Sequence, residues 1–417
     1  MKTNIVYTIR IMRKYFLSFA IAGAAAMMCS CAKEPGSCGQ DSGDAIEFGT
    51  YMGRDAQTRS DDSSVMDIDK LKETGFGVSA FYSGQDDWHL LENDTPNFMR
   101  SQKISWENGA WTYSPVKYWP TMTGDKITFF AYAPYAGEAG ENGFYRSDAF
   151  TSQHYTLKFK IQDKADKMVD FVAAEIYNMT RNENSNDNNL VTFEFHHTLS
   201  RLAFKARTSE DLDKDSHVVI RNAHLVKGGY FKQSTYYFHK KDEHINSWGP
   251  IDSKGDKEKD KLTEDYPLLP ILNTVTGTTI GGKPYNKDEH GNTINVLEIS
   301  SKDAKSIFKA DKYLFLIPEV AERETGKFGI AANSSAVSFE YDIVTRDSRL
   351  AAGYSCTSAV KTVYLPEGIL DQGKAYVVTF TFNVDRIEVS AKAEEWKDTE
   401  ESEIDVPFTP DNASSGK

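Results

Sequence analysis

Hydrophobic and polar residues alternate with a period of two along much of this chain. The alternation is clearest at residues 155–161, 191–195, 376–384 and 387–393. A period of two places every second side chain on one face of an extended strand, so each stretch predicts a half-buried strand. Many short strands separated by turn residues favour packed β-sheets, and the predicted fold class is therefore all-β, with β-sandwich domains.

Helical periodicity is rare in the sequence. The two candidates are residues 65–72, preceded by Ser63 and Ser64 as N-caps, and residues 167–176. Neither is long enough to form a layer of its own, because short helices depend on tertiary packing for their stability. We therefore expect few short helices.

The chain begins with the pattern of a secretory signal. Arg10, Arg13 and Lys14 precede an apolar run from Tyr15 to Met28, which is too short to span a bilayer. The run ends in Met28-Cys29-Ser30-Cys31 and then turns polar, as in a bacterial lipobox, and small Ser30 before Cys31 makes Cys31 the better lipidation site. The alternative is that both cysteines belong to a cleaved signal without a lipid.

Net charge limits the classes of partner. The sequence has 61 acidic and 48 basic residues and a charge of −13, and removal of residues 1–30 takes away four basic residues and no acidic one, which leaves −17. A surface of this sign repels phosphates, so nucleic acid is not an expected partner. Of the four cysteines, Cys38 and Cys356 lie beyond the targeting segment, and whether they pair stays open.

A length of 417 residues exceeds one typical domain and predicts two. The most polar stretch of the middle chain, residues 182–189, is the predicted boundary, although a long hairpin loop would have the same composition. The predicted divisions are a signal peptide at 1–30, a propeptide with a removable strand at 31–59, β-sandwich domains at 60–188 and 189–397, and a tail at 398–417.

The motifs that could carry chemistry have simpler interpretations. Gly277 to Lys283 has phosphate-loop spacing, but Pro284 replaces the required Ser or Thr, so a glycine-rich hairpin turn is favoured. The two Lys-Asp-Glu-His copies ending at His244 and His290 lack metal-ligand spacing, and His196-His197 is interpreted as a packed or hydrogen-bonded pair. We expect no cofactor, no metal and no enzymatic activity, although a hydrolase could assemble its residues without fixed spacing.

Aromatic residues are concentrated between Trp106 and Pro120. Trp106, Trp111, Tyr113, Tyr118 and Trp119 flank Gly109 and Pro115. A role in the core and in a hairpin is favoured over a sugar-stacking surface, because the residues alternate around these turn positions.

The two ends of the chain contain similar strand patterns. Ile46, Phe48, Thr50 and Met52 lie on one face of a predicted strand that precedes a polar run at 53–64. A protease could cut this exposed run, with Arg59 as the first site and Arg54 as the second.

Near the other end, Ile404, Val406 and Phe408 share one face of the tail. Removal of the first strand would open a sheet edge and an apolar groove, which the tail of another subunit could fill by strand addition. An ordinary first strand with a frayed tail explains the same residues equally well.

Several blocks together resemble one family. They are the lipobox, the strand from Ile46 before Thr58-Arg59-Ser60, Trp111 to Pro120, Phe129 to Pro134, Asp170 to Ala174, Val191 to Leu202, and Gly373 to Tyr376 leading to Trp396. In this order they resemble the fimbrillin (type V pilin) family of Bacteroidales, over nearly the whole chain from Cys31 to Trp396.

The resemblance implies two transthyretin-like β-sandwich domains and a structural subunit of a surface fimbria. Export as an outer-membrane lipoprotein on Cys31, cutting after Arg59 and strand exchange with other fimbrial subunits through Ile404 to Phe408 are also implied. Pro407 departs from an ideal donor strand, because it lacks a backbone N–H. Some members act as tips or anchors, so a tip adhesin or other surface-binding lipoprotein for a host protein or glycan is the alternative.

Overall fold

The computed structural model describes most strands of the chain and leaves several connecting segments undescribed. The described residues are 45–52, 65–91, 95–137, 144–145, 155–162, 167–181, 190–210, 212, 216–226, 231–238, 247–249, 266–267, 279–280, 283–284, 290, 296–301, 303–308, 313–318, 320–322, 327–328, 335–366, 370–383, 386–395 and 404–405.

A six-stranded sheet is the centre of the first half. Its order is β10 (His196–His197), β8 (Val172–Thr180), β5 (Lys126–Ala133), β2 (Phe76–Gly84), β3 (Met99–Glu107) and β4 (Ala110–Thr112). A two-stranded sheet of β1 (Glu47–Tyr51) and β9 (Leu190–Glu194) contributes to the same core. A four-stranded sheet has the order β14 (Ser247–Gly249), β13 (Gln233–Tyr237), β7 (Thr156–Lys160) and β6 (Phe144–Tyr145).

The central strands of the six-stranded sheet are buried on both faces. Phe129 of β5 contacts Phe48 of β1, whereas the next residue, Phe130, contacts Tyr155 and Phe238 beside β7 and β13. Successive side chains of a strand point to opposite faces, so a strand covered on both sides needs apolar residues throughout. This explains the run of phenylalanine, alanine and tyrosine in β5.

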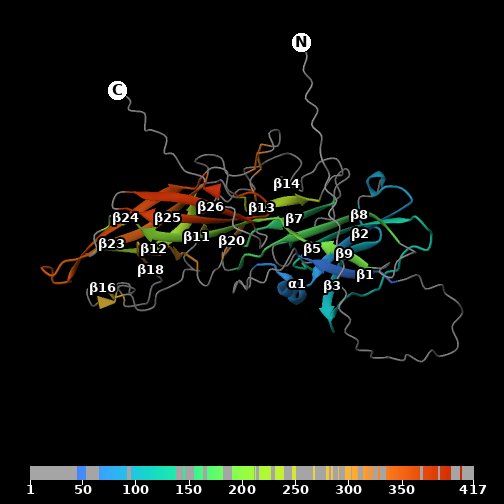
Figure 1. Ribbon diagram of the computed structural model, residues 1–417, viewed down its shortest axis with the longest axis horizontal. Helices are drawn as coiled ribbons and strands as arrows, with labels where there is room; N and C mark the ends of the chain where they lie inside the picture. The colour runs from blue at the N-terminus through green and yellow to red at the C-terminus, as the bar shows by residue number, and fades with distance from the viewer. Residues whose placement is uncertain are drawn as a thin grey trace, which may run out of the picture. The chain divides into compact units, whose positions relative to one another are not determined.

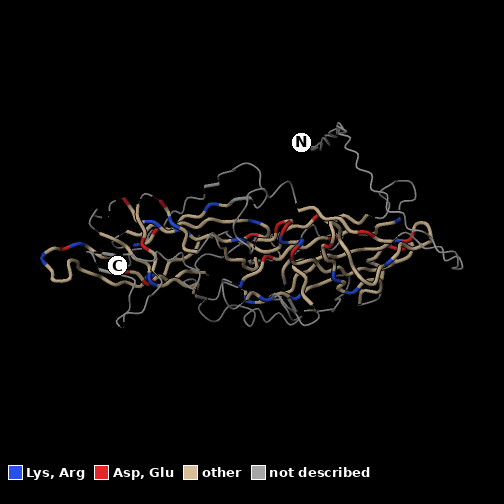
Figure 2. The backbone as a smooth tube through the Cα atoms, turned by 90° about the horizontal axis from the view of Figure 1, so that it is seen from below, with Lys and Arg blue, Asp and Glu red and all other residues tan. Residues whose placement is uncertain are grey.

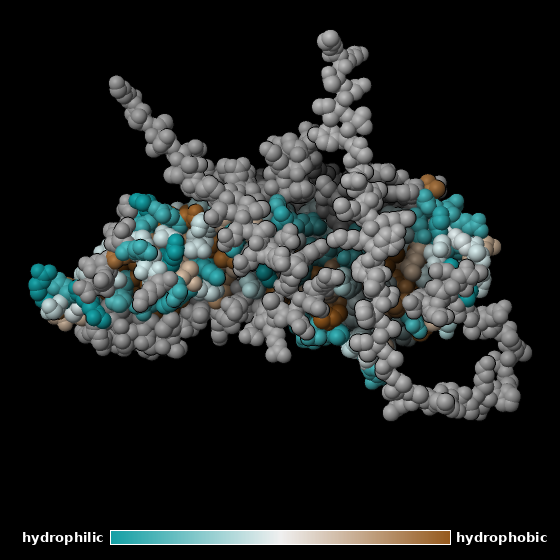
Figure 3. Space-filling model, in the orientation of Figure 1, coloured by the Kyte–Doolittle hydropathy of each residue, from teal (hydrophilic) through white to brown (hydrophobic). Residues whose placement is uncertain are grey.

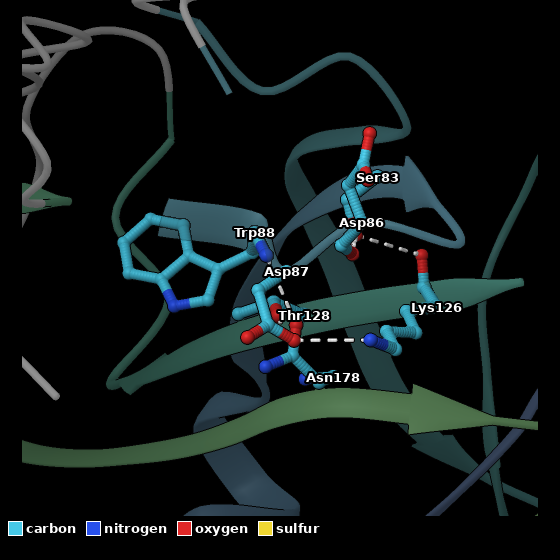
Figure 4. Close-up of polar contacts among 7 residues, drawn as sticks. All are labelled: Ser83, Asp86, Asp87, Trp88, Lys126, Thr128 and Asn178. Atoms are coloured by element: carbon cyan, nitrogen blue, oxygen red, sulfur yellow. Dashed lines mark hydrogen bonds and ion pairs between the residues drawn. The ribbon is translucent and has the colours of Figure 1, made fainter. Parts of the chain in front are cut away.

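The 3-10 segment η1 (Trp88–Leu90) lies at one end of this sheet, and Figure 4 shows its polar contacts. The main-chain N–H of Trp88 donates to Oδ1 of Asn178 at 3.0 Å, and Asn178 N–H donates to Oγ1 of Thr128 at 2.9 Å. Asn178 has a φ of 51°, which asparagine tolerates, and lies where the pairing of β5 with β8 shifts register. A pair of Lys126 Nζ with Asp87 Oδ1 at 3.0 Å joins the same turn to β5.

Two larger sheets form the second half. The first has the order β19 (Lys305–Ser306), β11 (Ser200–Thr208), β25 (Lys374–Phe382), β26 (Ile387–Glu395) and β27 (Ile404–Asp405), with β20 (Leu314–Leu316) also on β11. The second has the order β15 (Tyr266–Pro267), β12 (Ser216–Val226), β23 (Ala336–Arg346) and β24 (Tyr354–Tyr364), with β18 (Leu297–Ile299) also on β12. Phe339 of the second sheet lies 4.8 Å from Phe380 of the first, ring centroid to centroid, so the two sheets share a core.

Two short hairpins complete the described strands. They are β16 (Thr279–Ile280) with β17 (Lys283–Pro284), and β21 (Val320–Glu322) with β22 (Lys327–Phe328). The first hairpin agrees with the hairpin predicted for this sequence, because Thr279 pairs with Pro284 and Ile280 with Lys283.

The all-β prediction is confirmed, and α1 (Ile68–Thr74) is the one α-helix of the described residues. The predicted helix start at residue 65 with Ser63 and Ser64 as caps is wrong, because Asp67 is the N-cap and accepts a hydrogen bond from Lys70 N at 2.7 Å. The helix predicted at 167–176 is also wrong. Most of that segment belongs to or leads into β8, whose first residues are buried on both faces and therefore show no alternation.

Strand pairing crosses the domain boundary that we predicted between residues 188 and 189. β9 pairs with β1, β10 pairs with β8, and β13 pairs with β7, so strands after the boundary complete sheets that begin before it. The linker residues 182–189 themselves lie outside the described residues. A polar loop between strands has the composition of a linker, which is why composition did not separate the two cases.

The described backbone carries both charge signs along its length. Figure 2 shows Lys and Arg interspersed with Asp and Glu rather than gathered into one basic stripe. On the face shown in Figure 3, hydrophobic residues appear as small separate patches among hydrophilic ones.

Candidate functional site

Strand β1 is the one predicted site segment for which the structure describes the full strand, and it is bounded on two sides by other parts of the chain. Ile46 and Phe48 are buried, whereas Glu47 and Tyr51 on the same strand are exposed. Thr50 and Met52 are partly buried, and Met52 packs against the same core as Phe48. We call the residues that surround this strand the β1 seat: β9, the segment 111–118, and the rings of Phe76 and Phe129 beneath it.

One side of the β1 seat is a parallel ladder with β9, visible as a blue strand beside a green one in Figure 1. Glu47 pairs with Leu190 and the register continues without a shift to Tyr51, which pairs with Glu194. At the end of the ladder, Phe195 N–H donates to the carbonyl of Tyr51 at 2.9 Å. The strand is therefore part of a sheet whose other member lies about 140 residues later in the chain.

The other side of the β1 seat holds the strand through main-chain and side-chain bonds. Ile46 N–H donates to the carbonyl of Lys117 at 2.9 Å, and Tyr113 Oη donates to the carbonyl of Ile46 at 2.9 Å. Trp111 Nε1 donates to Oγ1 of Thr50 at 3.2 Å. Ala45 also forms an antiparallel bridge with Tyr118. Burial raises the pKa of the Tyr113 hydroxyl, so it stays protonated and able to donate.

The floor of the β1 seat is aromatic. The ring centroid of Phe48 lies 5.2 Å from Tyr113, 6.2 Å from Phe129 and 6.4 Å from Phe76. Burial of an apolar side chain of this size stabilises a fold by about 1.5–3 kcal/mol. β1 therefore contributes buried apolar side chains to this core.

The aromatic segment from Trp106 to Pro120 meets the predicted core and hairpin role in part, because Trp119 is buried whereas Trp106 and Tyr118 are 36% and 51% exposed. β3 and β4 pair across a turn at Asn108 and Gly109, which have φ angles of 52° and 84°. Trp119 is buried against Phe129, with ring centroids 6.1 Å apart. Alternation predicted burial, but it gave no signal that Trp111 and Tyr113 contact the first strand.

The chain that follows the predicted cleavage segment is fixed by a buried carboxylate. Met66 N–H donates to Oδ2 of Asp170 at 2.9 Å, and the same oxygen lies 2.9 Å from Nδ1 of His197. Asp170 is fully buried, and nothing in the sequence around it predicted this role. The 12 residues 53–64 thus join two anchored segments, one ending at Met52 and one beginning at Val65.

His196 and His197 are both partly buried and each contacts a buried side chain, which agrees with the prediction of a packed or hydrogen-bonded pair. Nε2 of His196 lies 3.0 Å from Oη of Tyr236, and His197 lies beside Asp170. Burial, with a smaller contribution from the charge of His197, lowers the pKa of His196 to about 4. Among the described residues, no group of three His, Cys, Asp or Glu side chains could hold a metal ion.

Several predicted site residues lie outside the described residues, namely Cys31, Cys38, Arg54, Arg59, Val406 and Phe408. Ile404 belongs to β27, which pairs with Ala393 and Lys392 of β26 in an antiparallel arrangement. Cys356 is exposed on β24. No helix in the described part of the chain is long and apolar enough to cross a membrane.

The chain is similar to known proteins in sequence and in fold. A family model described as fimbrillin-like matches residues 69–396. The fimbrium subunit Fim1C of Phocaeicola vulgatus is 26% identical over 364 residues, which cover 84% of this chain and 89% of that protein. The crystal structure of a fimbrial protein from Bacteroides vulgatus has a TM-score of 0.68 at 22% identity and covers 85% of this chain and 99% of its own, which shows a shared fold.

Proposed function

We propose that this chain, which belongs to the fimbrillin-like family, is a structural subunit of a cell-surface fimbria that assembles by exchange of the strand in the β1 seat. The observation that carries the proposal is the position of β1. It supplies Ile46 and Phe48 to the core, yet it is followed by a polar segment, 53–64, that a protease can cut. The precursor is exported as a lipoprotein on Cys31 and cut after Arg59, with Arg54 as the alternative.

Loss of β1 would leave two kinds of unsatisfied surface. The N–H and C=O groups of β9 that face β1 would lose their ladder, and Phe76, Phe129 and Phe193 would lose the ring of Phe48. An open edge beside an apolar groove binds an extended segment readily, with main-chain bonds for affinity and side-chain pockets for specificity. The tail of another subunit, with Ile404, Val406 and Phe408 on one face, is the proposed occupant.

Such an interaction is heterologous, because the tail of one copy binds the seat of the next. Heterologous contacts that do not close into a ring produce filaments. The expected partners are therefore other fimbrial subunits, and the expected location is the outer membrane first and the surface fimbria afterwards. The proposal assigns no catalysis to the chain.

A second function is favoured by one exposed aromatic residue. The Trp106 side chain is 36% exposed, and Lys72 Nζ lies 5.1 Å from its ring centroid. An exposed indole ring can stack on a sugar, so a tip adhesin that binds a host glycan or protein is the alternative. In that role the chain would keep its own β1 and would not polymerise.

The N-terminal residue of protein sheared from cells tests the proposal. Ser60 is expected for a polymerising subunit, whereas a lipidated Cys31 in all of the sheared protein would refute processing. Deletion of residues 403–417 should stop growth of filaments while the deleted chain itself still folds. Filaments of normal length from the deleted chain would show that the tail is not the donor.

A further inference from the structure

The main-chain groups of β1 point alternately to its two neighbours. Ile46 directs its N–H to Lys117 and its carbonyl to Tyr113, on one side of the β1 seat. Tyr51 directs its carbonyl to Phe195, at the end of β9 on the other side. The main-chain N–H and C=O groups of neighbouring residues in a strand point to opposite edges of that strand. Those of Glu47, Gly49 and Tyr51 therefore point towards β9, whereas those of Ile46, Phe48 and Thr50 point away from β9.

The side chains of β1 follow the same alternation. Ile46 and Phe48 are 1% and 5% exposed, so the residues whose side chains face the core are those whose main-chain groups point away from β9. For L-amino acids this coupling depends only on the direction of the strand. A strand in the same place can keep its apolar side chains inward and run in the opposite direction. The main-chain groups of its inward-facing residues then point towards β9.

Apolar residues occupy every second position of the tail from residue 404 to residue 408. Ile404, Val406 and Phe408 are its apolar positions, and Asp405 and Pro407 lie between them. If the apolar side chains are buried, those of Asp405 and Pro407 face outward. This holds for every register that keeps the apolar side chains buried, because such registers differ by two residues. In the direction of β1, Pro407 would face β9 and could not donate to it, so one carbonyl of β9 would lose its partner.

We infer that the donated tail of a second copy enters the β1 seat antiparallel to β9, opposite in direction to the strand that it replaces. Ile404, Val406 and Phe408 then fill the apolar floor and also form the ladder with β9. Pro407 lies on the opposite edge, where β1 donates through Ile46 N–H to Lys117 and, among the described residues, forms no continuous ladder. This inference rests on the proposed function and specifies how its site is occupied.

The reversed direction also favours completion of the exchange. β1 forms a parallel ladder with β9, and antiparallel pairing is somewhat more stable per residue. In the described chain, the start of the tail is held by only two residue pairs, Ile404 with Ala393 and Asp405 with Lys392. Release of this short pairing costs little compared with the ladder that a longer inserted segment forms.

A proline scan of the full-length chain tests the direction. Val406→Pro removes an N–H that the reversed strand uses, and Asp405→Pro removes one that it does not use. Val406→Ala and Asp405→Ala are the matched controls, because both keep the N–H. Fimbriae sheared from cells are measured for amount and length. Val406→Ala removes part of the apolar contact but keeps the N–H, so we expect fewer and shorter fimbriae in Val406→Pro than in Val406→Ala, and equal amounts in Asp405→Pro and Asp405→Ala.

The outcomes separate the inference from the function on which it rests. If the chain that lacks residues 403–417 still forms normal fimbriae, tail donation fails, and the direction fails with it. If that deletion abolishes fimbriae, then fewer fimbriae in Asp405→Pro than in Asp405→Ala, or equal amounts in Val406→Pro and Val406→Ala, overturns the direction alone.

Disulfide trapping gives a second measurement in a Cys356→Ser background. Glu403 precedes Ile404 and has the outward phase, and Leu190 and Glu194 are exposed at opposite ends of β9. The reversed direction predicts an inter-subunit disulfide between Glu403→Cys and Glu194→Cys in assembled fimbriae. A disulfide between Glu403→Cys and Leu190→Cys in its place would mean that the tail runs in the direction of β1.

Discussion

The ring of Phe48 stacks on the ring of Phe193, with centroids 5.7 Å apart and planes inclined by 18°. The two residues lie in neighbouring strands of a parallel pair, diagonally offset, because Phe48 is paired with Val191 and Thr50 with Phe193. This contact joins a segment that we propose is removed to a strand that stays. Substitution of Phe48 should therefore lower the stability of the precursor.

We expect Phe48→Ala to lower the free energy of unfolding of the full-length precursor by about 3–5 kcal/mol, the usual cost of removing a buried phenylalanine ring. Urea unfolding of the purified precursor measures the change. The matched control is Tyr51→Ala on the same strand, where the side chain is 42% exposed. That control should change stability by less than about 0.5 kcal/mol. Equal losses in both variants would contradict the proposed packing of β1.

Tyr113→Phe should loosen β1 without removing the ring that packs on Phe48. The variant deletes the hydroxyl that donates to the carbonyl of Ile46, and a hydrogen bond of this kind contributes about 1 kcal/mol. Amide hydrogen exchange of β1 residues is the measurement, with faster exchange expected at residues 46–51. Exchange in β25, in the other half of the chain, serves as the internal reference and should not change. Unchanged protection of β1 would show that this hydroxyl does not hold the strand.

Much of the fold was accessible from the sequence because alternation reports half-buried strands directly. Residues 155–161, 191–195 and 387–393 were predicted as strands, and β7, β9 and β26 lie there. Phe129 and Phe130 show the limit of the method. Both are buried, but on opposite faces, so the run around them has no period from which its two covering layers could be inferred.

Less of the candidate site could be predicted, because pairing between distant segments leaves no local pattern. Nothing near Phe48 indicates that its partner strand begins at Leu190 or that the two run parallel. The alternation of the first strand did identify which side chains are buried. The hydrogen bonds from Trp111 and Tyr113 required the three-dimensional arrangement, since aromatic residues in a hairpin usually serve only its own packing.

Asp170→Asn should weaken the anchor of the segment that follows residue 64. The substitution keeps the size of the side chain but replaces one carboxylate oxygen by an amide NH2, which cannot accept the hydrogen bonds that Oδ2 receives, and a disturbed buried hydrogen bond of this kind costs about 1–3 kcal/mol. Thermal unfolding measures the loss, and amide exchange at Met66 locates it. The control is Asp69→Asn in α1, whose side chain is 89% exposed. A destabilisation in Asp69→Asn as large as that in Asp170→Asn would remove the reason for assigning the anchor to Asp170.

His196 should make the stability of the protein depend on pH in a defined window. Its pKa is lowered to about 4, chiefly by burial, whereas the histidine of an unfolded chain titrates near its model value of 6.5. Between these values the unfolded chain binds a proton that the folded chain does not bind. Stability therefore falls as the pH falls from 6.5 towards 4.

The matched variant is His196→Gln, which cannot titrate and can still hydrogen-bond to Oη of Tyr236. Urea unfolding of both proteins from pH 8 to pH 4 gives the difference, in which titrations common to both cancel. Above pH 7 we expect a constant difference, because His196 is neutral in both folded and unfolded chains. From pH 6.5 to pH 4 the wild-type protein should lose roughly 3 kcal/mol relative to the variant. A difference that stays flat over this range, or a wild-type protein that gains stability on acidification, would mean that His196 is not held in its neutral form by the fold.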